Sequence, residues 1–381
     1  MSKAAPPFSS SLGSRSWRSV LVFIVILPIV ISFLVYRLDE FDPAEIPEQA
    51  WSWYSVSVPN HYSHLLNVTE RLGDGFLPGP EDLVYNEKTE LIYTGCEDGW
   101  IKRITLSESA SDTKIENWIH VGGRPLGLAF GPDNELVIAE AYKGLLKVTR
   151  EGVVQLLTNE AEGMKFGLID AVDVAQNGVI YFTDASYKYN FKNYMLNNLE
   201  GRPYGRLLSY DPSTNKTEVL VRDIYFANGV AVSPQHDFVI FCETTLRRCR
   251  KCYVEGEKQG MTDDFIARMP GYPDNIRYDG DGKYWIGLIS GNTYYSHLLL
   301  RYPFIRKALA ILTRYVNLQP VLSDGGVLAV NLDGEAIALY NDPGLGMVSS
   351  GIRVKDHIYY GSLATRYIRR ANLMHLTFAN A

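Results

Sequence analysis

The sequence contains few side chains that bind metals through sulfur or nitrogen, and it has no excess of positive charge. There are 4 cysteines and 7 histidines among 381 residues. The one C-x-x-C pair, Cys249 and Cys252, lacks the second pair or neighbouring histidines that a zinc site needs. On a single strand these two side chains face opposite sides and cannot bridge each other, so we expect unpaired, half-buried cysteines. A formal net charge of −6 argues against nucleic acid as a partner.

Charged residues are also absent from Ser19 to Tyr36, an almost wholly apolar run. Its length is about the minimum of ~17–20 residues that a helix needs to span a bilayer. Basic residues precede the run and acidic residues follow it, which places the N-terminus in the cytosol. We therefore predict a cytosolic tail at 1–18 and an uncleaved signal anchor at 19–36; a cleaved signal peptide is the alternative. The chain would be a single-pass type II membrane protein of the secretory pathway, in the endoplasmic reticulum, the vacuole or the cell surface, with its main domain in the lumen.

The segment after the predicted anchor, residues 37–75, contains several prolines and is expected to be a stalk that leads into the main domain. Two Asn-x-Thr sequons, at Asn67 and Asn215, would be available for glycosylation in a lumenal domain.

A unit of two short apolar strands joined by a polar turn recurs along residues 76–381. One copy runs from Phe226 to Thr245, and similar copies begin at Pro80 and Pro125. The second strands follow one another at intervals of about 45 residues, with two longer intervals, which is typical of four-stranded propeller blades. They are marked by Ile92, Val137, Ile180, Val239, Tyr284 and Ile358. Because one blade cannot bury its own faces, we predict an all-β, six-bladed β-propeller; a β-sandwich is the alternative.

The two longer intervals indicate insertions at about 186–203 and about 290–320. The second insertion carries apolar residues and cations at helical spacing, which predicts an amphipathic helix. Such a helix would cap the propeller, pack on its rim or lie on a membrane. The cations are Arg301, Arg306, Lys307 and Arg314.

One position of the repeat carries an oxygen donor in four blades. It precedes the first strand, and equivalent positions of innermost strands converge on the axis of a propeller. Each residue alone could be turn punctuation, but carboxylates that meet in a channel repel one another unless a cation joins them. Clustered hard oxygen donors are typical of calcium, and the lack of histidine or cysteine at these positions argues against zinc. We predict Ca²⁺ bound by Glu81, Asp170, Asn228, Asp274 and the adjacent Asn275.

Several segments resemble the strictosidine synthase-like family: G-P-E-D, F-A-N-G-V-x-x-S-P and G-Y-P-D-N-I-R, with G-R-P-L-G-L and A-Y-K-G-L between them. The resemblance extends from about residue 75 to the C-terminus and includes plant members, the animal adipocyte plasma membrane-associated protein and, more widely, paraoxonases and gluconolactonases. It implies a six-bladed propeller with calcium in its channel. The calcium residues of the family fall on Glu81, Asn228, Asp274 and Asn275, and Asp170 stands where the family usually has asparagine.

Two positions depart from relatives with known chemistry. The glutamate that strictosidine synthase uses as an acid and base aligns with Ser349, and the histidine of the second blade of paraoxonases aligns with Leu126. Without that glutamate, the condensation of an amine with an aldehyde lacks its proton carrier. A further histidine, His297 in the second insertion, is expected on a solvated loop; a position at the mouth of the channel is the alternative.

Three functions are compatible with this pattern. The preferred one is a calcium-dependent hydrolase of esters or lactones, in which calcium polarises the substrate oxygen. Asp274 would be its nucleophile or base, because some relatives use the matching aspartate in that way. The alternatives are a non-catalytic, membrane-tethered propeller that binds a protein partner, and a Pictet–Spengler condensing enzyme, which Ser349 disfavours. The sequence does not identify the substrate or a protein partner.

Overall fold

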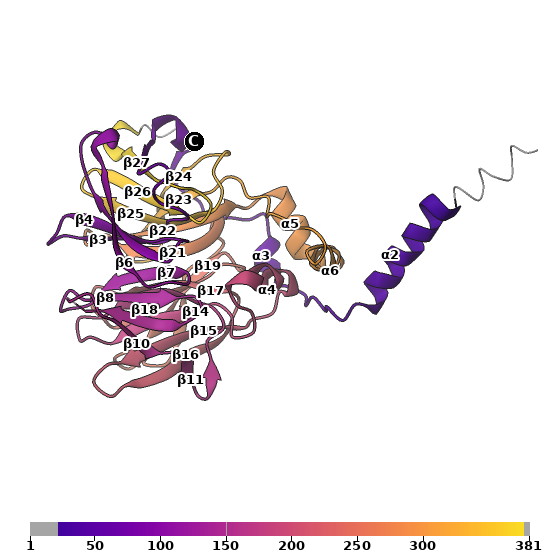
Figure 1. The fold of residues 1–381 in the computed structure, drawn as a ribbon, viewed down its shortest axis with the longest axis horizontal. Coiled ribbons are helices and arrows are strands. Elements are labelled where there is room, and N and C mark those ends of the chain that lie inside the picture. Colours follow the sequence, from indigo (N-terminus) through magenta and orange to yellow (C-terminus); the bar gives the residue numbers. More distant parts are fainter. Residues whose placement is uncertain (1–21, 150, 377–381) are drawn as a thin grey trace, which may run out of the picture.

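The computed structural model describes residues 22–149 and 151–376, and its main domain is a six-bladed β-propeller (Figure 1). The blades are antiparallel sheets, and the first strand of each contacts the first strands of its neighbours around the central channel. Blade 1 comprises β3 (Leu83–Asn86), β4 (Leu91–Gly95), β5 (Trp100–Thr105) and β6 (Lys114–His120). Blade 2 comprises β7 (Pro125–Phe130), β8 (Leu136–Glu140), β9 (Gly144–Val148) and β10 (Val154–Thr158). Blade 3 comprises β13 (Ile169–Val174), β14 (Ile180–Asp184), β15 (Gly205–Asp211) and β16 (Lys216–Ile224).

The other three blades continue in chain order. Blade 4 comprises β17 (Ala227–Val232), β18 (Phe238–Glu243), β19 (Arg248–Tyr253) and β20 (Thr262–Ile266). Blade 5 comprises β21 (Gly271–Tyr278), β22 (Lys283–Gly291), β23 (Gly326–Asn331) and β24 (Ala336–Asn341). Blade 6 contains β25 (Val348–Val354), β26 (His357–Ser362) and β27 (Ile368–Asn372). A short hairpin, β11 (Glu160–Ala161) and β12 (Met164–Lys165), separates blades 2 and 3. All six sequence markers lie on second strands, so the prediction of the repeat and of the propeller is confirmed.

The segment that was expected to be a stalk is built into the propeller. β2 (Glu70–Leu72) pairs with β27 and supplies the fourth strand of blade 6, and β1 (Asn60–Tyr62) runs parallel to β24 at the edge of blade 5. Leu72 is fully buried against Ile368 and its neighbours. The pairing covers edges that the last two blades would otherwise leave exposed. Two short helices, α3 (Glu48–Trp51) and η2 (Leu65–Val68), lie in the same segment.

Both predicted insertions are helical. The first forms η4 (Phe191–Asn193) and α4 (Tyr194–Glu200), and the second forms α5 (Tyr294–Arg301) and α6 (Pro303–Leu312). The second therefore contains two helices where one was predicted, because Pro303 ends α5 and begins α6. In Figure 1 these helices and α3 lie together on one side of the propeller. Short 3₁₀ turns also occur at η3 (Ala110–Asp112) and η5 (Leu373–His375).

The cations of the second insertion do not all lie on a solvated face as an amphipathic helix would place them. Arg306 is fully buried, and its guanidinium donates to the carbonyl oxygens of Leu199 and Glu200 at the end of α4 and to that of Ala44. These carbonyls have no partner within their own helix or turn, so the arginine satisfies them and joins three segments. Arg314, in contrast, is exposed and pairs with Asp39.

Residues 19–21 of the predicted anchor and the whole of the predicted tail, residues 1–18, lie outside the described residues. The described part forms η1 (Val22–Ile26) and α2 (Leu27–Leu38), a continuous helical run with exposed apolar side chains that leads away from the propeller in Figure 1. Across residues 22–149 and 151–376, no helix has both the length and the apolar character needed to cross a bilayer.

The expectation of unpaired cysteines is wrong for one pair. Cys242 and Cys249 form a disulfide, because they lie directly opposite each other on β18 and β19 with their Cα atoms 3.9 Å apart. Cys96 and Cys252 are free and buried rather than half-buried. Burial raises the pKa of the Cys96 thiol to about 12, so this thiol is unreactive at neutral pH.

Reduction of the Cys242–Cys249 disulfide is expected to lower the free energy of unfolding by about 2–3 kcal/mol, because it releases a short closed loop in the unfolded chain. Urea unfolding with and without reductant measures the difference. The double variant Cys242→Ser/Cys249→Ser should have the same free energy of unfolding with and without reductant. A reductant effect of equal size in that variant would show that the stabilisation comes from elsewhere.

Candidate functional site

The five predicted calcium residues come together at the channel. Four of them, from blades 1, 3, 4 and 5, line one cavity of about 220 Å³: Glu81, Asp170, Asn228 and Asp274. The fifth, Asn275, reaches the same place from β21, where its Nδ2 donates to Glu81 Oε1 at 2.6 Å. All five side chains are buried. We call these five residues the oxygen cluster.

Local irregularities of the innermost strands turn these side chains toward the channel. The register shifts between Ile169 and Val172 on β13, between Ala227 and Val230 on β17, and between Pro273 and Ile276 on β21. Such β-bulges add a residue to one strand and change the direction in which its side chain points. The residues of the cluster on these strands therefore lie at bulges inside the first strands, rather than before them as the sequence pattern predicted.

A glycine allows two of these strands to approach each other closely. A Cβ atom added to Gly229, next to Asn228, would lie 2.4 Å from the carbonyl oxygen of Asp274, closer than real Cβ contacts come. Gly229 thus brings blades 4 and 5 together at the cluster, and a larger residue would push Asn228 and Asp274 apart.

The backbone of Glu81 is fixed from blade 6. Ser349 Oγ donates to the carbonyl oxygen of Glu81 at 2.6 Å, and Ser350 Oγ donates to the same oxygen at 2.8 Å. Both serines are fully buried. The residue that aligns with the catalytic glutamate of strictosidine synthase therefore positions a cluster residue and offers no carboxylate to the cavity.

The three carboxylates of the cluster destabilise one another in their charged forms. Burial, followed by repulsion from Asp274 and other carboxylates, raises the pKa of Glu81 well above its usual range. Burial and repulsion from Asp170 do the same for the pKa of Asp274, which a hydrogen bond with Asn228 partly offsets. Burial raises the pKa of Asp170 to about 7. Clustered carboxylates with raised pKa values are typical of functional sites and favour a bound cation.

Two oxygens of the cluster are available for such a cation. Glu81 Oε2 and Asn228 Oδ1 are buried and have no hydrogen-bond partner among the described residues. Leaving buried polar atoms unpaired is costly, and a metal ion would satisfy both. Within the described chain, no group of three or more His, Cys, Asp or Glu side chains could hold a metal by itself. A site at this place has to include the asparagine oxygens and water, which is the donor chemistry of calcium rather than of zinc.

Sequence reasoning missed an arginine beside the cluster. Arg124 lines the cavity, is 4% exposed, and donates through Nη2 to the carbonyl oxygen of Gly79 at 2.8 Å. Its Nη1 has no partner among the described residues. Its positive charge acts to lower the pKa values of Glu81 and Asp170, but burial raises both pKa values by more. Arg124 precedes β7 and does not occupy the repeated register position, so the repeat gave no signal for it.

A charge pair between the half-buried Arg277 and the fully buried Asp82 lies next to the cluster. Arg277 of β21 contacts both carboxylate oxygens of Asp82, and it also donates to the carbonyl oxygens of Val172 on β13 and Leu128 on β7. The Asp82 carboxylate in turn accepts from the backbone N–H of Leu128 at 2.9 Å. One guanidinium therefore connects the innermost strands of blades 5, 3 and 2 and the residue that precedes β3 in blade 1.

The remaining walls of the cavity are mostly apolar, and Leu126 is one of them. No histidine is present among the described residues that line it. The expectation for His297 is wrong: this side chain is 7% exposed and is packed between Trp51 and Trp53, with its ring stacked on Trp53 at 4.5 Å. The N-terminal segment, which was expected to be a free stalk, supplies both tryptophans and buries it. The sequon residues Asn67 and Asn215 are exposed.

Comparisons with known proteins agree with this architecture. The family model described as "Strictosidine synthase" matches residues 170–257, and the one described as "Strictosidine synthase-like, N-terminal" matches residues 63–104. "Protein STRICTOSIDINE SYNTHASE-LIKE 7" of Arabidopsis thaliana is 46% identical over 356 residues, which cover 93% of this chain and 95% of that protein. The human adipocyte plasma membrane-associated protein is 35% identical over 343 residues, covering 82% of this chain and 80% of that protein.

Solved structures show the same fold at much lower identity. A gluconolactonase of Xanthomonas campestris superposes with a TM-score of 0.56 at 14% identity, covering 87% of this chain and 98% of that one. Regucalcin of Agrobacterium tumefaciens, described as a calcium-binding protein, gives a TM-score of 0.55 at 14% identity, covering 83% and 95%. The identity to the Arabidopsis and human proteins extends over most of each chain, and on that basis the chain belongs to the strictosidine synthase-like family.

Proposed function

We propose that the protein is a calcium-dependent hydrolase of esters or lactones whose reaction takes place at the oxygen cluster. The observation that carries the proposal is a set of three buried carboxylates with raised pKa values, beside the unpaired oxygens Glu81 Oε2 and Asn228 Oδ1, in a cavity whose other walls are mostly apolar. The gluconolactonase and the calcium-binding regucalcin that share the fold provide general support.

The residues of the oxygen cluster have different roles in the proposed hydrolysis. Bound by Glu81, Asp170, Asn228, Asp274 and Asn275, calcium would supply a positive charge that polarises the carbonyl oxygen of the substrate. Asp274 is the nucleophile or the base. As nucleophile it attacks the carbonyl carbon, the ester C–O bond breaks and the alcohol leaves, and water then hydrolyses the resulting anhydride; as base it takes the proton of the water that attacks the carbonyl carbon and displaces the alcohol. Asn228 orients Asp274 through their hydrogen bond. Apolar walls such as Leu126 and Phe226 exclude bulk water, which strengthens each of these electrostatic interactions.

The same geometry argues against a condensing enzyme. Pictet–Spengler chemistry needs a group that moves protons near the amine, and Ser349 is committed to the carbonyl oxygen of Glu81.

We also propose that the apolar segment 19–36 tethers the propeller to a membrane of the secretory pathway, with the propeller in the lumen. Three features support this topology. The charges that flank the segment follow the positive-inside rule. The Cys242–Cys249 disulfide is typical of an oxidising compartment. Finally, both sequon asparagines are exposed, as glycosylation requires.

The hydrolase proposal predicts ester or lactone turnover that requires calcium. The purified full-length chain is assayed with phenyl acetate, p-nitrophenyl esters and a panel of lactones, in calcium and in chelator. Asp274→Asn is expected to lower kcat/KM by about 100-fold or more, because it removes the group that transfers the proton or attacks the carbonyl. Asp263→Asn, which changes an exposed carboxylate on β20, is the matched control and should retain full activity. Calcium binding without turnover of any substrate would reject the hydrolase in favour of a non-catalytic calcium-binding propeller.

A further inference from the structure

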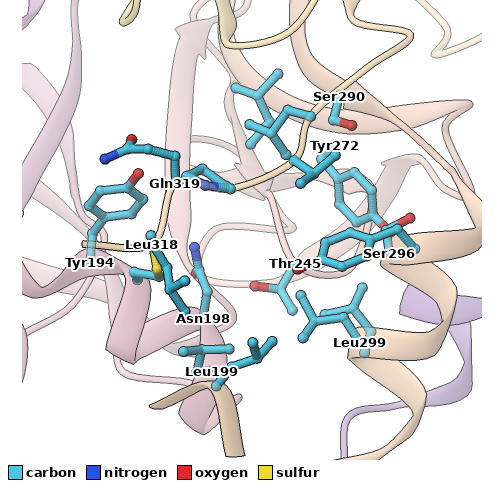
Figure 2. A pocket seen from close by; sticks show the side chains of 18 of the residues that line it. Tyr194, Asn198, Leu199, Thr245, Tyr272, Ser290, Ser296, Leu299, Leu318 and Gln319 are labelled. Atoms are coloured by element: carbon cyan, nitrogen blue, oxygen red, sulfur yellow. The ribbon is translucent and has the colours of Figure 1, made fainter. Parts of the chain in front are cut away.

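A second cavity, of about 320 Å³, lies between the two insertions (Figure 2). Helices α4, α5 and α6 supply much of its wall, and the irregular segment 318–322 and residues of blades 4 and 5 supply most of the rest. In Figure 2 the labelled side chains of Leu199, Leu299 and Leu318 surround this space. We call it the apolar chamber.

The apolar chamber adjoins the cavity of the oxygen cluster. Six residues line both spaces, so the two cavities lie directly next to each other. The shared residues are Tyr194, Asn198, Thr244, Ile289, Pro320 and Leu322. Two of these come from α4 and two from the segment after α6, which means that the insertions build the chamber beside a site that the propeller itself provides.

The chemistry of the chamber selects an uncharged, apolar occupant. No charged side chain and no histidine is present among the described residues that line it. Its surface is mostly apolar, and leucines from three helices and the 318–322 segment are part of it. A charged group would lose its hydration there without gaining a partner, whereas a hydrocarbon chain would be removed from water at no such cost.

Asn198 marks the junction between the two spaces. It lines both cavities, and its Oδ1 is buried without a hydrogen-bond partner among the described residues. Figure 2 shows this side chain reaching from α4 into the space that the labelled residues surround. This unpaired amide oxygen can accept a hydrogen bond from a ligand. The donor group of that ligand would lie between an apolar chain in the chamber and a carbonyl at the oxygen cluster.

We propose that the apolar chamber binds a flexible hydrocarbon chain of the substrate while the carbonyl of that substrate lies at the oxygen cluster. The inference rests on the proposed hydrolase and narrows it: the substrates are esters or lactones with an acyl or alkyl chain, not compact polar lactones. Each methylene that enters the chamber should tighten binding by about fourfold, because burying one methylene contributes about 0.8 kcal/mol.

The test measures binding without turnover. Methyl ketones of increasing chain length, which carry a carbonyl but no ester bond, are titrated into the full-length chain in lipid nanodiscs by calorimetry. Leu299→Trp places a bulky side chain in the chamber. If this variant does not fold, Leu309→Trp, which fills the chamber from α6, takes its place. Leu312→Trp, an exposed position on α6, is the matched control. Partition of the ketones into the nanodisc is the same for every variant, so differences between variants report the chamber.

We expect affinity for the wild type and for Leu312→Trp to rise with each added methylene. The chamber-filling variants should lose that rise and bind the longest ketone at least tenfold more weakly. Equal chain-length dependence in all variants, or none in the wild type, would overturn the inference. A further outcome would overturn the chamber but leave the hydrolase proposal intact. In that outcome the wild type hydrolyses esters without chain-length preference, and Leu299→Trp hydrolyses them equally well. Length-dependent ketone binding without any ester turnover would support the chamber and reject the hydrolase.

Discussion

Arg277→Met is expected to lower the free energy of unfolding by about 3–5 kcal/mol, a large fraction of the stability of a domain. The guanidinium is 12% exposed and is the partner of the fully buried Asp82. Methionine has a similar length but no charge, so the Asp82 carboxylate would remain buried without its counter-ion. The variant would also lose the hydrogen bonds to Leu128 and Val172 that connect three innermost strands. Urea unfolding, followed by tryptophan fluorescence, measures the change.

Two controls separate the buried pair from a general effect of removing an arginine. Arg222→Met breaks an exposed ion pair with Glu162 and should leave the unfolding midpoint unchanged, because exposed pairs contribute little. The double variant Asp82→Asn/Arg277→Met should be destabilised by less than the sum of the two single variants, because it leaves no unpaired charge. Additive losses in this cycle would show that the two groups do not interact across the channel.

Calcium is expected to stabilise the protein strongly at pH 8 and weakly near pH 5. At a free concentration of about 100 times Kd, a ligand that binds only the folded state adds about 2.7 kcal/mol to the free energy of unfolding. The proposed calcium site requires ionised carboxylates, and protons would compete with calcium for the same groups. Thermal unfolding at several pH values, in calcium and in chelator, measures this dependence.

The sign of the pH effect follows from the raised pKa values of the metal-free protein. Burial, with repulsion from Asp82, raises the pKa of Asp170 from 3.8 to about 7. Burial, with repulsion from neighbouring carboxylates, also raises the pKa values of Glu81 and Asp274. The folded state therefore holds more protons than the unfolded state between pH 4 and 7. Metal-free stability should be highest below this window and should fall as pH rises through it. Bound calcium is expected to remove this loss of stability, because it would replace the protons at the carboxylates.

Variants of the cluster test this account. Glu81→Gln and Asp274→Asn should each lose most of the stabilisation by calcium. In chelator at pH 8, Asp170→Asn should be more stable than the wild type, because it removes one of the repelling charges. Asp263→Asn, on the exposed edge of blade 4, should behave as the wild type in both conditions. Calcium stabilisation that persists in both Glu81→Gln and Asp274→Asn would exclude the cluster as the binding site.

The propeller was predictable because each blade repeats the same pattern. Strands such as β8 around Val137 and β18 around Val239 carry a continuous apolar run, which marks them as central strands buried on both faces. The oxygen cluster was predictable for the same reason, since a repeated position in the sequence becomes a repeated position around the axis. The bulges that turn these side chains were not predictable, because a bulge is a property of the pairing between two strands rather than of either one.

The repeat pattern does not reveal residues that lie outside the repeated positions. Arg124 and Arg277 gain their importance from partners in other blades, and no spacing along the chain indicates those contacts. The Cys242–Cys249 disulfide depends on the register of β18 against β19, which the C-x-x-C motif obscured. Residues 60–62 and 70–72 are polar and short, with little pattern of their own. They become strands because the edges of blades 5 and 6 provide hydrogen-bond partners.

The fourth strand of blade 6 also has a consequence for how the chain is made. β2 is synthesised long before its partner β27, because the other blades lie between them in the sequence. The pair joins residues about 300 positions apart, as the contact between Glu70 and Arg370 shows. Long-range pairing of this kind is slow and leaves strand edges exposed until it is complete. The ring can close only after β27 has been synthesised, so a chain truncated before β27 would keep an open blade and require chaperone protection.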